Sequence, residues 1–326
     1  MKALFIGGTG NISGAVVERA IEKGWDVTLL NRGNKPLPAG VGSIIADINN
    51  EASVAAAIKD LHFDVVAQFI AFVPADVERD IRLFKGHTDQ YIFISTASAY
   101  QKPPVNLIIT ESTPLINPFW DYSSLKADCE RVLLDEPDFP VTIVRPSHTY
   151  SEKPLVCVQG EKGPWQVVKR MLENKPVILP GDGTSSWTMT HASDFAKGFV
   201  ALMGNPHAAQ QAYHITTDET MSWNQIYQTI ARAAGVEVKI VHITSDDLAV
   251  LGEHYNYRGQ MFGDKAVPVL FDNSKIKAVA SEFVCTTTMA EGLTKATLNF
   301  LASPELQVED PEFDAWCDEI IALKKF

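Results

Sequence analysis

The chain has 326 residues, of which 46% are hydrophobic and 21% are charged, a balance typical of a globular protein. Its formal net charge is −12, and because an acidic surface repels phosphates, we expect neither nucleic acid nor anionic lipid to be the main partner. No apolar run approaches the roughly 18 residues that a membrane-spanning helix needs, so we expect no membrane segment.

In the first 150 residues, short apolar runs alternate with amphipathic helical patterns. The runs are rich in Val, Ile and Phe, as expected for parallel strands buried on both faces. The alternation predicts an α/β fold, a doubly wound parallel sheet of the Rossmann-like kind with helices on both faces. The predicted strands are 2–8, 26–33, 43–48, 63–72, 90–100 and 140–147, and the predicted helices are 12–24, 51–61, 76–86 and 119–136.

Beyond Tyr150 this rhythm changes, and loop-like stretches separate the regular patterns. We therefore expect a dinucleotide-binding domain at 1–150 and a smaller C-terminal lobe at 151–326 that binds substrate. Segments near 190–235 are expected to rejoin the first domain, because 211–217 has the composition of another sheet strand. The predicted helices here are 165–174, 191–205 and 222–236, the last beginning after Ser222 as N-cap, and the other predicted strands are 176–187 and 238–244.

A glycine-rich loop, FIGGTGNISG, follows the first predicted strand, and Gly7 and Gly10 stand three apart within it. Gly7 allows a tight turn, and Gly10 lets the backbone approach a pyrophosphate at the helix N-terminus. Ser13 stands where a third glycine is expected, a mild departure because serine is small. The alternative is a plain strand–helix turn, but the position between strand and helix favours dinucleotide binding. Other predicted cofactor contacts in this loop are Thr9, Asn11 and Ile12.

The end of the second predicted strand bears on which dinucleotide is bound. NAD-binding proteins usually have a carboxylate there, but this chain has Asn31 and Arg32, with Lys35 nearby. A guanidinium suits a 2′-phosphate, so we predict NADP in preference to NAD; the alternative is an exposed arginine that caps the turn. Asp47, after the third predicted strand, could accept a hydrogen bond from the adenine amine or could be the N-cap of the next helix.

The predicted helix 119–136 places Tyr122 and Lys126 four apart on one face. With these residues, the glycine loop and Thr96, the sequence resembles the extended short-chain dehydrogenase/reductase family, the NAD(P)-dependent epimerases and dehydratases. Within it, LFIGGTGNIS and FDNSKIK are similar to a branch that includes chloroplast stem-loop binding proteins and bacterial proteins of poorly defined substrate. The stretches that carry the resemblance, in family order, are GGTGNISG, ISTASAY, YSSLK, RPSHTY and GDGTSSWTMTHASDFA.

The resemblance implies a role for each matching residue. Thr96, Tyr122 and Lys126 match the catalytic threonine, tyrosine and lysine of the family. Ala71 matches a backbone position beside the nicotinamide ribose, and Pro146 begins a loop against the nicotinamide ring. By analogy with the family, the protein is also expected to form a homodimer.

The residue types suit this chemistry. When hydride leaves an alcohol carbon, the hydroxyl proton must leave as well, and a tyrosine can take it if its pKa falls from about 10. The charge of Lys126 is expected to favour the phenolate of Tyr122. Thr96 lies where ligands of an open parallel sheet collect, and it can hold the substrate oxygen. Without these neighbours, Tyr122 and Lys126 would be interpreted as a solvated helix face with a snorkelling lysine.

Three further residues are predicted to contact the substrate. Ser98 could share the site with Thr96, whereas strand alternation sends Ser95 to the other face of the sheet. His148 stands where the family often has asparagine, so the substrates of the sugar-nucleotide enzymes do not carry over directly. Arg258, among aromatic residues, could hold an anionic substrate group; the alternative is a surface arginine.

The sequence thus predicts an NAD(P)-dependent oxidoreductase or epimerase that acts on a hydroxyl or keto carbon of a sugar nucleotide or another carbohydrate-like substrate. The alternative is a catalytically weak Rossmann-fold protein that binds RNA or senses nucleotides.

The start of the chain breaks at glycines too early for a signal peptide. The four scattered cysteines lack metal-binding spacing, so we expect no metal site and reduced thiols in the cytoplasm.

Overall fold

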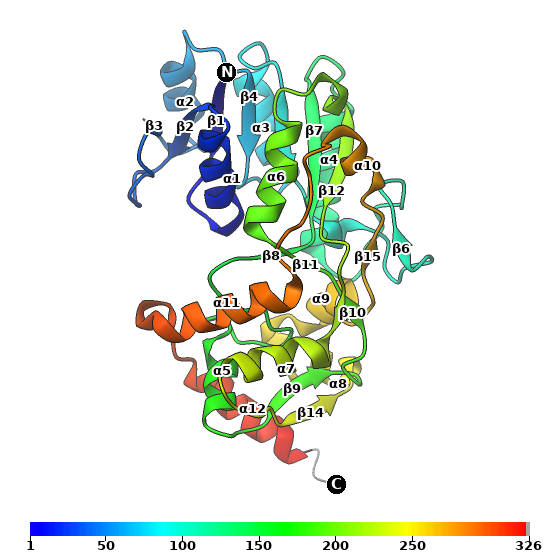
Figure 1. Ribbon diagram of the computed structural model, residues 1–326. Helices are drawn as coiled ribbons and strands as arrows, with labels where there is room; N and C mark the ends of the chain where they lie inside the picture. Colours follow the sequence, from blue (N-terminus) through cyan, green and yellow to red (C-terminus); the bar gives the residue numbers. More distant parts are fainter. Residues whose placement is uncertain (324–326) are drawn as a thin grey trace.

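The computed structural model describes residues 1–323, which form a sheet layered with helices above a smaller lobe (Figure 1). The sheet strands are β1 (Lys2–Ile6), β2 (Asp26–Asn31), β3 (Gly42–Ile45), β4 (Val65–Gln68), β5 (Tyr91–Ile94), β7 (Val141–Pro146) and β12 (Gln211–Ile215). They lie in the order β12-β7-β5-β4-β1-β2-β3, and each neighbouring pair is parallel. The predicted doubly wound, Rossmann-like α/β fold is confirmed.

Helices cover both faces of this sheet, as Figure 1 shows. Side chains alternate along β1, so that Ala3 and Phe5 join the core on one face while Leu4 and Ile6 join the core on the other. The first face carries α1 (Asn11–Glu22) and α6 (Ala192–Leu202), and the second carries α2 (Glu51–Ile58), α3 (Pro74–Phe84) and α4 (Asp121–Leu134).

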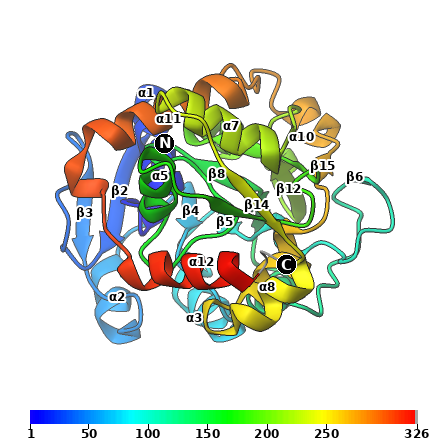
Figure 2. The same cartoon turned by 90° about the horizontal axis from the view of Figure 1, so that it is seen from below.

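The lower lobe has its own apolar core, in which Trp187 and Trp223 stack with ring centroids 5.0 Å apart. Its parallel strand pair is β9 (Val177–Pro180) with β14 (Ile240–Ile243). Figure 2, seen from below, shows α12 across the outside of this lobe. The helices of the lobe are α5 (Trp165–Leu172), α7 (Trp223–Ala233), α8 (Ser245–Leu251), α9 (Tyr257–Gln260), α11 (Met289–Ala302) and α12 (Pro311–Leu323).

The chain passes between the two parts several times. Of the segment near 190–235, α6 and β12 belong to the sheet layers, whereas α7 contributes Trp223 to the core of the lower lobe. A later helix, α10 (Ser274–Val279), returns to the sheet and buries Ile276 beside α6. The remaining short strands are β6 (Ile108–Ile109), β8 (His148–Tyr150), β10 (Ser186–Trp187), β11 (Met189–His191), β13 (Met221–Ser222) and β15 (Leu270–Phe271).

Local signals explain where elements begin and end. Gly24, with φ +80°, follows α1 as the sequence predicts, and Ser222 caps α7 by accepting a hydrogen bond from the backbone N–H of Gln225. The strand predicted at 90–100 ends instead at Ile94. There the hydroxyl of Thr96 caps a 3-10 turn, which removes the backbone from the sheet.

No helix in the described part of the chain is long and apolar enough to cross a membrane. The four cysteines are unpaired in the structure.

A buried ion pair sets the rotation of α4 against the sheet. The guanidinium of Arg145, in β7, donates to both carboxylate oxygens of Glu130, with the Nη2–Oε2 distance 2.5 Å. Both side chains are almost fully buried. Glu130 lies one helical turn beyond Lys126, so this pair also determines which way the predicted catalytic face of α4 points.

We expect Glu130→Gln to lower the free energy of unfolding by about 3–5 kcal/mol, because it leaves the charge of Arg145 buried without its partner. Urea denaturation followed by circular dichroism measures the change. Arg131→Gln, at the next and exposed position of the helix, serves as control and should keep the wild-type midpoint. Equal midpoints for Glu130→Gln and wild type would show that the ion pair does not hold α4.

Candidate active site

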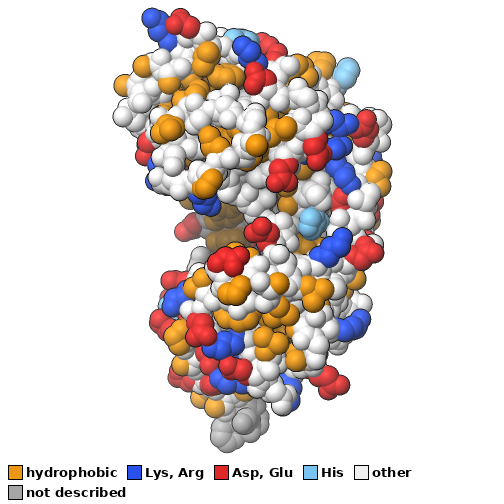
Figure 3. Space-filling model, turned by 60° about the vertical axis from the view of Figure 1, so that its left-hand side comes forward, with side chains coloured by type: hydrophobic (Ala, Val, Ile, Leu, Met, Phe, Trp, Pro, Cys, Tyr) orange, Lys and Arg blue, Asp and Glu red, His pale blue; other side chains and the backbone are white. Residues whose placement is uncertain are grey.

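A cleft runs along the carboxyl ends of the sheet strands, where ligands of such sheets collect. Figure 3 shows the surface hollowed between the sheet and the lower lobe. The cleft comprises two cavities, of about 600 and 420 Å³, that share Phe72 as a lining residue. We call them the adenosine-side cavity, lined by Gly7, Thr9, Asn31, Arg32 and Asp47 among others, and the tyrosine-side cavity, lined by Ile12, Thr96, Ser98, Tyr122, Lys126, Pro146 and His148 among others.

The glycine loop has the shape that a bound dinucleotide requires. Gly7 and Gly8 adopt φ +103° and +92°, and a Cβ added to Gly8 would lie 2.5 Å from Cδ2 of Leu29. Ser13 does more than replace a glycine, because its hydroxyl accepts a hydrogen bond of 2.9 Å from the backbone N–H of Gly10. The loop is therefore capped and held open at the N-terminus of α1, which favours anions.

The side chain of Asn11, predicted to contact the cofactor, is engaged with the protein instead. Its Nδ2 donates to the carbonyl of Thr149 at 2.9 Å, and its Oδ1 accepts from the hydroxyl of Ser151. Asn11 thus ties the glycine loop to β8 and the segment after it. This tertiary contact has no signal in the sequence.

Hydrogen-bond donors gather at the end of β2. The Oδ1 of Asn31 accepts from the backbone N–H of Gly33 at 2.8 Å, while its Nδ2 is buried without a partner among residues 1–323. Arg32 is exposed, lines the cavity and makes no hydrogen bond or ion pair within the described chain. The amine of Lys35 lies 3.4 Å from the carbonyl oxygen of Thr9. The orphaned amide and the open glycine loop both fit a dinucleotide.

Asp47 also lines the adenosine-side cavity, and its Oδ1 accepts from the backbone N–H of Asn49 at 2.9 Å. The N-cap of α2 is Asn50, whose side chain accepts from the backbone N–H of Ser53. The alternative interpretation of Asp47 as that N-cap is therefore wrong. Its position beside the cavity leaves the adenine contact as the interpretation that the structure favours.

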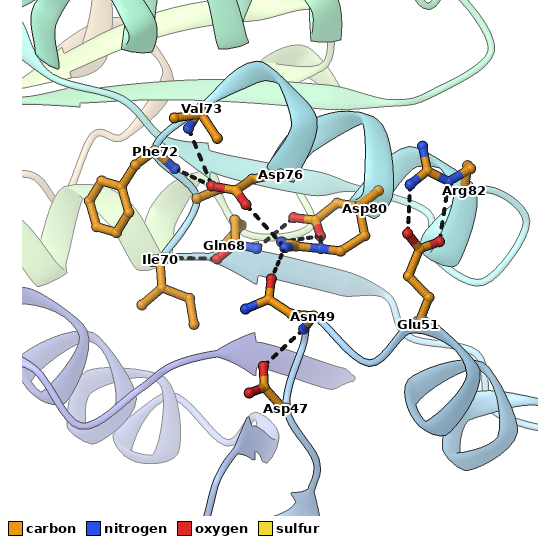
Figure 4. Close-up of polar contacts among 12 residues, drawn as sticks. Asp47, Asn49, Glu51, Gln68, Ile70, Phe72, Val73, Asp76, Asp80 and Arg82 are labelled. Carbon is orange, nitrogen blue, oxygen red and sulfur yellow. Dashed lines mark hydrogen bonds and ion pairs between the residues drawn. The ribbon is translucent and has the colours of Figure 1, made fainter. Parts of the chain in front are cut away.

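The loop after β4 joins the two cavities and is held by side chains on both sides (Figure 4). The carboxylate of Asp76, in the first turn of α3, accepts from the backbone N–H groups of Phe72 and Val73 at 2.8 and 3.2 Å. Gln68, at the end of β4, accepts from the backbone N–H of Ile70 at 2.7 Å. The loop therefore has a fixed shape where its backbone lines the cleft.

A buried carboxylate supports this loop from behind. Asp80 accepts from the hydroxyl of Tyr91 at 2.6 Å and from Nε2 of Gln68 at 2.5 Å. Arg79 donates to Asp80 and also reaches Oδ1 of Asn49 at 2.7 Å, so it links α3 to the chain after β3 (Figure 4). Burial raises the pKa of Asp80, and these donors oppose that shift.

Lys126 lines the tyrosine-side cavity. Its ammonium donates to the carbonyl oxygens of Ala71 and Ile94, at 2.7 and 2.6 Å, at the ends of β4 and β5. The residue is only 2% exposed, so the alternative interpretation as a snorkelling surface lysine is wrong. Burial lowers the pKa of Lys126 to about 8, because the interior disfavours its charge.

Tyr122 is half-buried and packs its ring 5.0 Å from that of Trp120. Burial raises the pKa of Tyr122, and a hydrogen bond with Thr96 opposes the shift. This direction is opposite to the one expected, because Lys126 spends two of its donors on backbone carbonyls rather than on the phenol. The structure thus gathers Thr96, Tyr122 and Lys126, but the protein's own charges do not favour the phenolate.

The three hydroxyl groups after β5 have different surroundings. Ser95 donates to Glu130, so its hydroxyl is committed to the buried ion pair. Ser98 lies 3.0 Å from the hydroxyl of Thr96 and accepts from the hydroxyl of Ser123 at 2.8 Å. Thr96 and Ser98 therefore lie together in the lining of the cavity. The 3-10 turn Ala97–Ala99 places them there rather than strand alternation, and Ser95, predicted to lie on the other face of the sheet, lines the cavity as well.

The other two predicted substrate contacts differ in outcome. His148 lines the cavity, and its Nδ1 accepts a hydrogen bond of 2.9 Å from the indole N–H of Trp187. Burial lowers the pKa of His148 to about 3, so the ring is neutral and its proton is on Nε2. Arg258 lies outside the lining of the cavity, because its guanidinium is exposed above the ring of Phe262 at 5.9 Å.

Sequence reasoning missed several residues of the cavity. Phe72 lies in the loop after β4 and Trp120 comes directly before α4, and neither residue belongs to a motif. Asp264 comes from the lower lobe, far along the chain, so no local pattern could have placed it here. Within residues 1–323, no group of three or more His, Cys, Asp and Glu side chains is arranged to hold a metal ion.

Comparison with known proteins agrees with this geometry. Residues 3–216 match the model of the NAD dependent epimerase/dehydratase family, which is more than half of the chain. The protein therefore belongs to the NAD dependent epimerase/dehydratase family. The cleft described above has the position at the strand ends that a dinucleotide site has in sheets of this kind.

The chain is 25% identical over 257 residues to chloroplast stem-loop binding protein of 41 kDa b from Arabidopsis thaliana, covering 74% of this chain and 65% of that one. It is 26% identical over 163 residues to the uncharacterized UDP-glucose epimerase YtcB of Bacillus subtilis, covering 49% of each. These matches span less than two thirds of either relative. UDP-glucuronic acid 4-epimerase from Bacillus cereus has the same fold, with a TM-score of 0.72, 20% identity and coverage of 93% and 99%.

The depressed pKa of His148 predicts an acid-sensitive fold. The unfolded chain takes up this proton near the ordinary pKa of 6.5, whereas the folded chain takes it up only near 3, so stability falls as the pH drops through that window. The stability of His148→Gln relative to wild type should therefore rise between pH 6.5 and 3, as measured by urea titrations. The exposed His207→Gln serves as control, and parallel curves for wild type and His148→Gln would contradict the prediction.

Proposed function

We propose that the protein is an NADP-dependent oxidoreductase or epimerase that moves a hydride to and from a hydroxyl-bearing carbon of a sugar nucleotide or another carbohydrate-like substrate. Tyr122 is its acid and base. The observation that carries this proposal is the meeting of Tyr122, Thr96 and the ammonium of Lys126 in one cavity, which shares Phe72 with the cavity at the glycine loop.

Each of these groups has a part in the reaction. The bound nicotinamide supplies the hydride chemistry, so the protein has to move the hydroxyl proton. Thr96 holds the substrate oxygen beside Tyr122, which takes the proton in one direction and returns it in the other. Lys126 has three donors and gives two to backbone carbonyls, which leaves one for a ribose hydroxyl of the cofactor.

The positive charge of the oxidised nicotinamide ring couples cofactor binding to proton transfer by Tyr122. Burial raises the pKa of Tyr122, so its phenolate needs more positive charge than the protein's own groups supply. The oxidised nicotinamide ring carries such a charge. Tyr122 therefore becomes a competent base only when the cleft holds the oxidised cofactor.

The preference for NADP rests on the end of β2. Asn31 presents its amide nitrogen, because its oxygen is bound to the backbone of Gly33, and Arg32 adds an exposed guanidinium. Both groups are donors, which suits a 2′-phosphate, whereas the 2′-hydroxyl of NAD is usually held by a carboxylate.

Arg32→Ala should weaken NADP binding about ten- to a hundredfold and change NAD binding less than about threefold, because only NADP carries the phosphate. Fluorescence titration of the reduced dinucleotides measures both constants. Lys59→Ala removes the same charge from an exposed position just after α2 and should leave both constants unchanged. Equal losses for NADP and NAD would show that Arg32 reads no phosphate.

Tyr122→Phe should lower kcat by roughly 10²–10⁴-fold, because the phenyl ring cannot exchange a proton, while the dissociation constant of NADP stays within about twofold. Turnover of a panel of nucleotide sugars, followed by dinucleotide absorbance and product chromatography, provides the measurement. Tyr255→Phe, in the lower lobe, is the matched control. Undiminished turnover by Tyr122→Phe would remove this tyrosine from the mechanism.

The substrate class is supported by similar proteins: the Bacillus subtilis relative is named as a UDP-glucose epimerase, and the Bacillus cereus structure holds UDP-glucuronic acid and NAD. RNA binding, the alternative function, finds support in the name of the Arabidopsis relative alone, and the net charge of −12 disfavours it. A homodimer and a cytoplasmic location stay predictions.

A further inference from the structure

A carboxylate from the lower lobe lines the tyrosine-side cavity and has no hydrogen-bond or ion-pair partner in the part of the chain that the structure describes. Asp264, in the π-helical turn Met261–Lys265, lines this cavity together with Thr96, Tyr122 and His148. Within residues 1–323, its carboxylate makes no hydrogen bond and no ion pair. A partly buried acceptor without donors is unfavourable unless a ligand supplies them, so the carboxylate needs an explanation.

Two contacts place this turn firmly over the catalytic residues. The Nδ2 of Asn117 donates to the carbonyl of Ser98 and to that of Gly263, both at 2.7 Å, so one buried amide ties the loop after β5 to the turn. A Cβ on Gly263 would lie 2.7 Å from Cβ of Trp120, so only glycine allows this approach. π-Helical turns of this kind are frequent at functional sites.

The charges around Asp264 lie behind it rather than in the cavity. Burial raises the pKa of Asp264, whereas the ammonium groups of Lys102 and Lys265 oppose that shift. Lys265 donates to the carbonyl of Cys157 and to Gln260, and neither lysine lines the cavity. Asp264 therefore offers the cavity a carboxylate that no cation on the same wall neutralises.

We propose that Asp264 binds a hydroxyl group of the substrate beside the carbon that exchanges hydride, and that it thereby selects sugars with a neutral group at this place over sugars with a carboxylate there. This inference rests on the proposed function. It names a specificity-determining residue that the family motifs do not include, because it lies beyond the stretch that matches the family.

A hydroxyl group suits two of the polar side chains that line this cavity, Asp264 and His148. Asp264 can only accept hydrogen bonds when ionised, and the neutral ring of His148 can donate from Nε2, so one sugar hydroxyl can donate to the first and accept from the second. A substrate carboxylate beside Asp264 would face a like charge in a partly apolar cavity, and the ammonium of Lys126, which lines the same cavity, already donates to two backbone carbonyls.

The test compares two probes, UDP-glucose and UDP-glucuronic acid, which differ at C6 by a hydroxymethyl group and a carboxylate. Both are titrated by calorimetry into the full-length protein saturated with NADP. Wild type is expected to bind UDP-glucose at least about tenfold more tightly, since hydrogen bonds to a charged group are worth this much. Asp264→Asn should reduce the ratio about tenfold by tightening UDP-glucuronic acid, and Asp264→Ala should weaken UDP-glucose about tenfold.

Controls separate charge from folding. Glu253→Gln makes the same charge change at an exposed position of the lower lobe and should keep the wild-type ratio. Thermal melting of each variant identifies a loss of fold, and Asp264→Asn keeps the shape of the side chain. A ratio in Asp264→Asn equal to wild type, a wild-type preference for UDP-glucuronic acid, or no binding of either probe would overturn the inference.

A second readout would not respond to a merely structural role. The charge of Asp264 raises the pKa of Tyr122, so Asp264→Asn should move the Tyr122-dependent limb of the kcat/KM profile to lower pH, and Glu253→Gln should not move it. The proposed function has a test of its own: turnover retained by Tyr122→Phe would contradict it. An unmoved limb in Asp264→Asn, with turnover still dependent on Tyr122, overturns only the role of Asp264.

Discussion

The site depends on one buried ammonium. Lys126 donates to the carbonyls of Ile94, the last residue of β5, and Ala71, which lies just beyond the end of the adjacent strand β4. A charge 2% exposed must be hydrogen-bonded, so the helix that carries it can sit in only one register against the sheet edge. That register also turns Tyr122, one helical turn earlier, toward Thr96. The positions of Lys126 and Tyr122 in the cleft thus follow from one requirement, that the buried ammonium be hydrogen-bonded.

Other parts of the fold support this register. The ion pair of Arg145 with Glu130 fixes the far end of the same helical face. Asp76 and Gln68 hold the loop that supplies the carbonyl of Ala71 (Figure 4). Polar groups that are buried and fully paired resist displacement, because opening them exposes unpaired charges. The cleft is therefore built on rigid contacts, as an enzyme that must align a ring, a hydroxyl and a phenol requires.

The electrostatic balance of the site differs from the simple picture in which a lysine beside a tyrosine lowers its pKa. Lys126 gives two of its three donors to backbone carbonyls, burial raises the pKa of Tyr122, and the charge of Asp264 raises that pKa further. In the proposed mechanism, Tyr122 becomes a competent base only with the oxidised cofactor in place, which avoids unproductive ionisation of the empty enzyme. The lower lobe contributes to this balance through Asp264, whose charge raises the pKa of Tyr122 across the cleft.

By itself, the sequence determined the alternation of strands and helices in the first 150 residues and the glycine loop at the N-terminus of α1, because periodicity and local spacing encode such features. The family resemblance singled out Thr96, Tyr122 and Lys126, and the structure places all three in the lining of one cavity. The sequence left two roles open for Asp47, the adenine contact and the N-cap of the next helix. For Lys126 it left open whether the side chain is buried or lies at the surface. Only the tertiary structure decided these points, since each depends on contacts between distant segments. The engagement of Asn11 with Ser151, the exposure of Arg258 and the approach of Asp264 to Tyr122 likewise arise from the packing of the lower lobe against the sheet, which no local pattern records.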